Sequence, residues 1–202
     1  MKGNTYTICF AAILGTVCAL LLTGAAKFTE EARERNKVAE KYRNIFMALS
    51  IEFDAKATAE DMGKLFTEKI TTEETDKLTL YKYEDGDEIN GIAVEFEGAG
   101  RNAKIKGILA FEKDLRTIKG ITFYEQEETP GIGGDIAMPY FRERFVGKKI
   151  VDADGNAGIV IKAGLIDPGQ NEIDGISGAT MTVDKVSDML NKVIERLAVS
   201  EK

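Results

Sequence analysis

Histidine and tryptophan are absent from this chain of 202 residues, and its two cysteines, Cys9 and Cys18, lie close to the N-terminus. Histidine is the side chain that most often serves as a general base near neutral pH and as a metal ligand. Its absence excludes Ser-His-Asp hydrolases, Cys-His proteases and zinc sites built on histidine. Because no cysteine follows Cys18, thiol chemistry is excluded from the rest of the chain. Any reaction must therefore use hydroxyls, carboxylates, amines or a bound cofactor.

The chain also lacks an excess of positive charge. It has 27 Lys and Arg against 34 Asp and Glu, which gives a formal net charge of −7. Affinity for nucleic acids comes largely from cations that neutralise phosphates, so we expect no nucleic-acid partner. Low-complexity segments and fixed-period repeats are absent too. The length suits one domain with an appendage.

The appendage is an apolar segment at the N-terminus. Residues 3–26 form a run of 24 uncharged residues, and about 20 such residues span a hydrocarbon core of about 30 Å. A cleaved signal peptide with Gly24-Ala25-Ala26 as its cleavage site is the alternative. The length of the run favours a retained anchor. We therefore assign residues 1–27 to a transmembrane anchor and residues 28–202 to one domain.

The charges beside this segment bear on its orientation. A single cation, Lys2, precedes the run, whereas Lys27, Arg33, Arg35 and Lys37 follow it closely. The positive-inside rule would place the domain in the cytoplasm. Because the rule has only one short N-terminal tail to count, the charges alone leave the side open.

Helical periodicity marks the beginning of the domain, a lead-in over residues 28–70. Apolar residues at helical spacing predict a helix over residues 29–49 that continues outward from the anchor. A shorter helix is predicted over residues 58–69, where Thr58 and Asp61 imitate a capping box.

The period changes to that of strands in the core of the domain, residues 78–202. Four strands are predicted at residues 78–83, 89–96, 105–111 and 118–124, with a hairpin turn at Asp85-Gly86 between the first two. A fifth strand is predicted at residues 159–163, and a closing helix at residues 182–198. Runs of strands flanked by helices indicate an α+β fold with an antiparallel-rich sheet, rather than a doubly wound sheet.

The first unusual loop, which we call the Pro-Gly loop, spans residues 127–134 and reads Glu-Glu-Thr-Pro-Gly-Ile-Gly-Gly. Its glycines and proline favour tight turns and permit close approach of a ligand to the backbone. Composition alone also fits an ordinary surface loop. Glu125, Glu127 and Glu128 raise the idea of a cation site, but the Asp-rich spacing of calcium loops is missing.

The second, the Ser-Gly-Ala-Thr loop, spans residues 174–182 and leads directly into the predicted closing helix. Small residues at a helix N-terminus leave free N–H groups and a positive dipole end, which suit a phosphate. It is not a Walker A loop, because no Gly-Lys-Ser/Thr follows. The other interpretation is that Thr180 or Thr182 merely caps the helix. The residues alone leave both interpretations open.

A resemblance to a known family separates the two interpretations of the second loop. In the second loop Asp174, Ser177, Gly178, Ala179 and Thr180 match the Asp-x-x-Ser/Thr-Gly-Ala-Thr motif of FMN-binding domains. The Pro-Gly loop is similar to the Glu-Thr-Pro-Gly-Leu-Gly stretch of the same domains. The wider string around it, with the N-terminal anchor, resembles the NqrC family, whose members belong to the sodium-translocating NADH:quinone reductases. A tryptophan common near these motifs is missing.

The resemblance implies a modified threonine. A separate Mg²⁺-dependent flavin transferase, with FAD as donor, would join FMN through its phosphate to Thr180, and the rest of the motif would serve partly as a recognition tag. Thr182, at the helix start, belongs to the region that would stabilise the phosphate. Ring contacts through backbone N–H groups and an apolar face are expected from Thr129, Gly131 and Ile132. Lys162 is a candidate cation near the cofactor, although a solvated strand residue is the simpler interpretation.

The implied function is that of a membrane-anchored electron carrier without catalytic side chains or a metal of its own. Its partners would be the other subunits of a sodium-translocating NADH:quinone reductase. Its domain would lie on the periplasmic or extracellular side of the cell (inner) membrane. One alternative is the sister family RnfG, of the ferredoxin:NAD oxidoreductase complex, or a stand-alone extracellular flavin carrier. Another is an anchored module without redox function, in which the second loop is only a helix cap.

Overall fold

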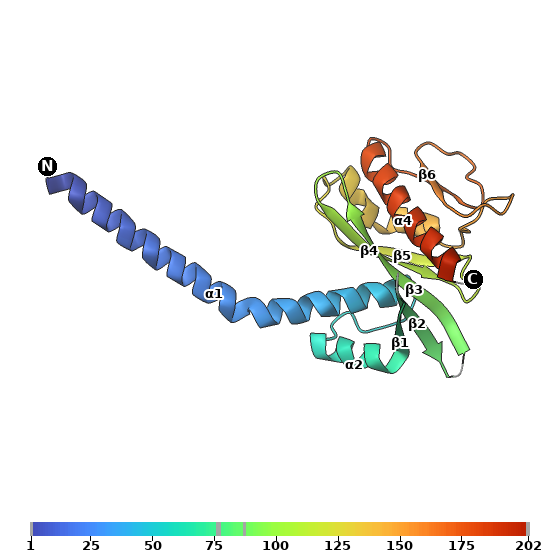
Figure 1. Ribbon diagram of the computed structural model, residues 1–202, viewed down its shortest axis with the longest axis horizontal. Helices are drawn as coiled ribbons and strands as arrows, with labels where there is room; N and C mark the ends of the chain where they lie inside the picture. The colour runs from blue at the N-terminus through green and yellow to red at the C-terminus, as the bar shows by residue number, and fades with distance from the viewer. Residues whose placement is uncertain (1, 76–77, 87, 201–202) are drawn as a thin grey trace.

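The computed structural model describes residues 2–75, 78–86 and 88–200. A long helix projects from a body in which a sheet lies between helices, as Figure 1 shows. The N-terminus lies at the far end of the projecting helix and the C-terminus lies on the body. The predicted α+β class is confirmed.

The projecting helix, α1 (Lys2–Ala48), runs without a break from the apolar segment into the body. The most apolar stretch of α1 has no residue buried against the body. Within the described residues, α1 is the one helix that is long and apolar enough to cross a membrane. Burial begins at Ala39 and continues through Ile45, Phe46 and Leu49. The predicted continuation of the anchor as a helix is therefore correct, and the last turns of α1, from Ala39 onward, belong to the core.

The short helix α2 (Ala59–Lys69) begins where its capping box predicts. The Thr58 hydroxyl accepts a hydrogen bond from the Asp61 N–H at 3.2 Å, and the Asp61 carboxylate accepts one from the Thr58 N–H at 3.1 Å. These bonds satisfy N–H groups that a helix start leaves unpaired. Stacking of Tyr42 on Phe66, with ring centroids 3.9 Å apart, packs α2 against α1.

The sheet is an antiparallel meander of five strands in chain order. The strands are β1 (Ile70–Glu74), β2 (Thr79–Asp85), β3 (Glu88–Ala99), β4 (Lys104–Phe111) and β5 (Ile118–Glu125). The four longer strands and the β2–β3 hairpin were predicted. Strand β1 was not, because only its first residue is buried, so its sequence lacks the alternation that marks a half-buried strand.

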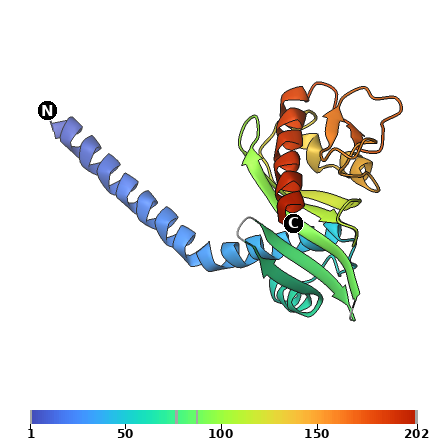
Figure 2. The same ribbon diagram turned by 45° about the vertical axis from the view of Figure 1, so that its right-hand side comes forward.

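Each face of the sheet has its own apolar core, because successive side chains of a strand point to opposite faces. Ala93, Ile108 and Ala110 face α1 and α2. Val94 and Leu109 face the closing helix. Figure 2 shows this helix lying across one face, with α1 and α2 against the other.

The remaining elements follow β5. They are η1 (Gly133–Ala137), α3 (Pro139–Arg142), η2 (Glu143–Phe145), β6 (Val160–Lys162), β7 (Glu172–Asp174) and α4 (Thr180–Ser200). Strands β6 and β7 pair in parallel. The three short helices and β7 were not predicted, because segments of three to five residues carry too little periodicity. The closing helix was predicted, but it begins two residues earlier than expected.

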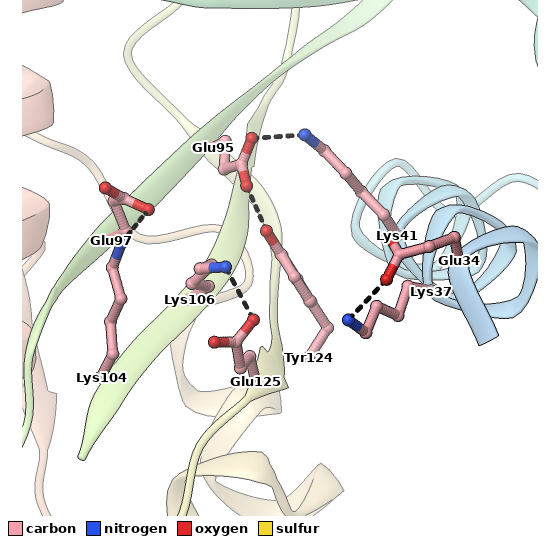
Figure 3. A network of polar contacts seen from close by, with 9 residues as sticks. All are labelled: Glu34, Lys37, Lys41, Glu95, Glu97, Lys104, Lys106, Tyr124 and Glu125. Carbon is pink, nitrogen blue, oxygen red and sulfur yellow. Dashed lines mark hydrogen bonds and ion pairs between the residues drawn. The ribbon is translucent and has the colours of Figure 1, made fainter. Parts of the chain in front are cut away.

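A polar network also ties α1 to the sheet, as Figure 3 shows. Lys41 Nζ lies 2.5 Å from a Glu95 carboxylate oxygen, and the Tyr124 hydroxyl donates to the other oxygen of Glu95. Burial raises the pKa of Tyr124, and the neighbouring Glu95 carboxylate raises it further. The phenol is therefore neutral and acts as the donor. The network lines a cleft of about 450 Å³ between α1 and the sheet.

Candidate functional site

The two loops singled out by the sequence meet at the side chain of Glu128, which is only 5% exposed. Its carboxylate accepts hydrogen bonds from the backbone N–H groups of Arg101, at 2.8 Å, and Asn102, at 2.9 Å. It also accepts one from the Thr182 hydroxyl at 2.7 Å. The β3–β4 turn, the Pro-Gly loop and the first turn of α4 are thus joined at one carboxylate.

These donors keep Glu128 ionised. Burial alone would raise the pKa of the Glu128 carboxyl, but hydrogen bonds from Asn102, Thr182 and Arg101 outweigh burial and hold the pKa below its ordinary value. A buried carboxylate with such partners is an anion fixed by the fold.

The idea of a cation site near this loop is not supported. Among the described residues no group of three acidic, cysteine or histidine side chains is arranged to hold a metal ion. The oxygens of Glu128 are engaged by N–H and O–H donors, and Glu125 forms an ion pair with Lys106 at 2.7 Å. Both acidic side chains therefore have structural partners.

Close approach of the two loops requires glycine at position 133. A Cβ atom there would lie 2.6 Å from Thr182 Oγ1 and 2.9 Å from a Glu128 carboxylate oxygen. Both distances are shorter than real Cβ contacts. Gly133 therefore allows the Pro-Gly loop to pack directly on the start of α4.

The Pro-Gly loop is folded on itself by its own hydrogen bonds. The N–H of Ile132 donates to the Thr129 carbonyl at 3.1 Å, and the N–H of Gly131 donates to the Asp135 carboxylate at 2.9 Å. These two N–H groups were expected to face a flavin ring, but they are already used within the loop. The Ile132 side chain, 38% exposed, is the apolar surface that remains.

The Ser-Gly-Ala-Thr loop makes a turn immediately before α4. The N–H of Ala179 donates to the Ile176 carbonyl at 3.1 Å, and Gly178 has a φ of +80°. Glycine adopts this conformation without the strain that a side chain would add. Ser177 and Gly178 are exposed at the tip of the turn, whereas Ala179 is buried.

The start of α4 lacks a side-chain cap from its N-cap residue. The first helical hydrogen bond runs from the Val183 N–H to the Ala179 carbonyl at 3.0 Å, so Ala179 is the N-cap residue. Its methyl side chain has no oxygen to accept the N–H groups of the first turn. The hypothesis that Thr180 or Thr182 is the N-cap residue is therefore wrong, because both lie inside the helix.

Of the two threonines, only Thr180 is accessible. Thr180 is exposed as the first residue of α4, whereas Thr182 is 2% exposed and donates its hydroxyl to Glu128. Met181 lies beside Thr180 with 59% of its surface exposed. The helix start thus combines an accessible hydroxyl, N–H groups that no side chain of the described residues caps, and exposed apolar side chains. These features fit a phosphate joined to a flat apolar ring.

Asp174, the first residue of the motif, shapes the neighbouring turn. One of its carboxylate oxygens accepts hydrogen bonds from the N–H groups of Gly164, at 2.8 Å, and Leu165, at 3.1 Å. The other lies 3.2 Å from Arg144 Nη1. Lys162 pairs with Asp174 in the register of β6 and β7 and is exposed, as expected for a solvated strand residue.

Arg101, Asn102 and Arg144 contact the two loops but were not predicted as site residues. The Asn102 amide donates to the Thr129 hydroxyl at 3.3 Å and thereby touches the Pro-Gly loop from the β3–β4 turn. These contacts join segments about thirty residues apart, and neither spacing nor periodicity in the sequence marks them.

Comparison with known proteins places this site in a family. The family described as FMN-binding domain matches residues 100–195, which include the β3–β4 turn and both loops. The chain is 30% identical to the NqrC subunit of the Na(+)-translocating NADH-quinone reductase of Vibrio anguillarum, over 86% of this chain and 83% of the relative. It is 36% identical to the same subunit of Vibrio vulnificus strain YJ016, over 66% of this chain and 55% of the relative.

Solved structures have the same fold. NqrC of Shewanella oneidensis superposes with a TM-score of 0.65 at 22% identity, covering 79% of this chain and 91% of that chain. The corresponding protein from Parabacteroides distasonis gives a TM-score of 0.68 at 24% identity, covering 81% and 92%. Shared sequence over most of both chains, rather than shared fold alone, decides the assignment: the chain belongs to the NqrC family of the Na⁺-translocating NADH-quinone reductases.

Proposed function

We propose that this protein carries FMN, attached through its phosphate to the Thr180 hydroxyl, and relays electrons within a Na⁺-translocating NADH:quinone reductase. The observation that carries the proposal is the exposed hydroxyl of Thr180 at the uncapped start of α4, within the part of the chain that matches FMN-binding domains. FMN supplies the redox chemistry, which the side chains of this chain do not provide.

The residues around Thr180 hold and orient the attached group. The first-turn N–H groups and dipole of α4 stabilise the negative charge of the phosphodiester by about 0.3–1 kcal/mol where it is exposed to water. The exposed side chains of Ile132 and Met181 offer an apolar surface to the ring. The bond between Thr182 and Glu128 holds these two surfaces in register.

Attachment requires a separate enzyme. An alkyl hydroxyl is a weak nucleophile without an activating base, and this chain has no histidine. We propose that a Mg²⁺-dependent flavin transferase uses FAD as donor. A bond forms between Thr180 Oγ and the phosphorus of the FMN half, the anhydride bond of FAD breaks, and AMP leaves. The hydroxyl proton passes to a base of the transferase.

The apolar half of α1 is proposed to anchor the protein, as residues 1–27, with the domain on the periplasmic or extracellular side. A covalent bond retains the cofactor where no cytoplasmic flavin pool can replace it. The partners in this proposal are the other subunits of the reductase. The names of the relatives favour the NADH-dependent complex over the ferredoxin-dependent one.

Labelling tests the attachment site. The full chain, co-expressed with a flavin transferase, should give a fluorescent band that survives denaturing electrophoresis. Thr180→Val should abolish the band. Thr72→Val, the same change at an exposed threonine on β1, is the matched control and should retain it. A fluorescent band of normal intensity from Thr180→Val would show that the flavin is attached elsewhere.

A further inference from the structure

Arg144 takes part in a second connection between the two loops, made of contacts other than those of Glu128. We propose that Arg144 is a positioning residue for the flavin: it holds the Ser-Gly-Ala-Thr loop against the Pro-Gly loop, so that Thr180 is presented to the transferase and the attached ring is held in place. This inference rests on the proposed attachment of FMN to Thr180.

On one side, Arg144 forms hydrogen bonds with the backbone that precedes the proposed attachment point, Thr180. Its Nη1 donates to the carbonyl oxygens of Asp174, at 2.8 Å, and Gly175, at 2.7 Å. The same nitrogen lies 3.2 Å from the Asp174 carboxylate. Hydrogen bonds assisted by a full charge are stronger than neutral ones. The next residue, Ile176, begins the turn that ends at Ala179, directly before Thr180.

The opposite edge of this backbone is fixed as well. The N–H of Gly175 donates to the Lys162 carbonyl at 3.0 Å, and a Cβ atom at Gly175 would lie 3.0 Å from the Ala163 nitrogen. The peptide is thus packed against the end of β6. Arg144 supplies the contacts to its carbonyl groups.

On its other side, Arg144 is linked to the Pro-Gly loop. Its guanidinium carbon lies 5.5 Å from the centroid of the Tyr140 ring. The Tyr140 hydroxyl donates to one Asp135 carboxylate oxygen at 2.9 Å, and the other oxygen of Asp135 accepts the Gly131 N–H. A continuous path therefore runs from the expected ring contacts to the carbonyls that precede Thr180.

The backbone that carries Arg144 is held by two buried aromatic side chains. Phe141 and Phe145, on either side of it in α3 and η2, are fully buried, and their rings meet edge to face at 5.3 Å. The Arg144 side chain is 33% exposed, so its charge is only partly screened by water. The Ser-Gly-Ala-Thr loop is thus connected to the Pro-Gly loop at two separate points: at Asp174 and Gly175 through Arg144, and at Thr182 through Glu128.

The geometry of these contacts predicts which substitution of Arg144 retains its positioning role. All three polar contacts involve one nitrogen, Nη1. A lysine ammonium also places several donors and a positive charge on one nitrogen, whereas methionine has neither. Arg144→Lys, one atom shorter, should therefore largely retain the positioning, whereas Arg144→Met keeps an unbranched apolar stem but loses the donors and the charge, and with them the positioning.

The experiment uses the full chain in detergent, with purified flavin transferase, FAD and Mg²⁺, and measures the initial rate of attachment by in-gel fluorescence and intact mass. Misplacement of a reacting group by about 1 Å costs on the order of a hundredfold in rate, and we expect a slowing of at least about tenfold for Arg144→Met. Arg144→Lys, which keeps a positive charge and several donors on one nitrogen, should be slowed less than Arg144→Met. Longer incubation of Arg144→Met should yield labelled protein whose flavin has a lower fluorescence anisotropy.

Thermal unfolding of each variant separates positioning from stability, because a merely structural arginine would change the unfolding temperature without freeing the ring at temperatures well below it. Equal attachment rates and equal anisotropy in Arg144→Met and the unsubstituted chain would overturn the inference while leaving the proposed function intact. A label that persists in Thr180→Val would instead overturn the proposed function.

Discussion

At the residue scale, Glu128 carries the largest share of the local organisation. It is an ionised and nearly inaccessible carboxylate that accepts hydrogen bonds from the β3–β4 turn and from the first turn of α4. Hydrogen bonds to charged groups are worth about 1.5–3 kcal/mol each, and their loss leaves buried donors unpaired. The two loops and the β3–β4 turn therefore depend on this one charge for their relative placement.

The pH dependence of stability tests this role. Because the pKa of Glu128 is lower in the folded chain than in the unfolded one, its contribution is fully present above the unfolded value of about 4.3 and is lost as the pH falls through the folded value. We expect Glu128→Gln to lower the free energy of unfolding by about 1–3 kcal/mol at pH 7. The difference from the unsubstituted chain should shrink as the pH falls below about 4. Urea denaturation at several pH values measures it, and a difference that does not change with pH would contradict this account.

Two glycine substitutions form a second test at this scale. Gly133→Ala places a Cβ atom against Thr182 and Glu128, and overpacking of this kind costs about 1–3 kcal/mol. Gly63→Ala, in α2, meets nothing within 4 Å and should stabilise the chain by about 0.5–1 kcal/mol, because alanine favours helix. Thermal unfolding compares the two. Equal effects of the two substitutions would mean that the loops do not pack as described.

At the element scale, α1 has two different roles along one helix. Its first half is exposed and apolar, and its last turns, from Ala39 to Ala48, pack against the sheet. The ion pair between Lys41 and Glu95 adds a polar contact at the point where the helix leaves the body (Figure 3). The apolar segment and the core of the domain are therefore continuous along one helix.

Truncation separates the two roles. A chain shortened to residues 28–202 should stay folded and soluble, since the apolar segment that it loses has no buried part. The full chain should sediment with membranes. Circular dichroism and fractionation by ultracentrifugation check both expectations. An unfolded truncated chain would show that the first half of α1 contributes to the fold.

The elements also show what a sequence can predict. The capping box of α2 and the alternation in β2 to β5 are local signals, and these elements lie where they were expected. The edge strand β1 has one buried residue and therefore no alternation to detect. The start of α4 was predicted two residues too late, at Thr182, because the apolar periodicity of the helix does not extend to Thr180. The roles of Arg144 and Asn102 arise from contacts between distant segments, which only the folded chain brings together.

At the scale of the whole molecule, the proposal combines a helical anchor, an acidic domain and a cofactor added after translation. The cations beside the apolar segment favour a cytoplasmic domain, whereas family membership underlies the proposed periplasmic or extracellular position. A tethered group has an effective concentration on the order of millimolar near its site, so a covalent flavin stays available without a free pool. The two placements of the domain differ in their access to reagents outside the cell.

Labelling of intact cells decides the orientation. Lys64→Cys places a thiol on the exposed face of α2, in a chain whose Cys9 and Cys18 are replaced by alanine. A thiol reagent that cannot cross the cell membrane should label this variant without lysis of the cells. Labelling only after lysis would place the domain in the cytoplasm.

The mass of the protein isolated from its native membrane tests the central claim most directly. We predict the mass of the chain with its apolar segment retained, increased by one FMN less one water, with the added mass on the peptide that contains Thr180. A chain of unmodified mass, or a flavin attached to any other residue, would contradict the account.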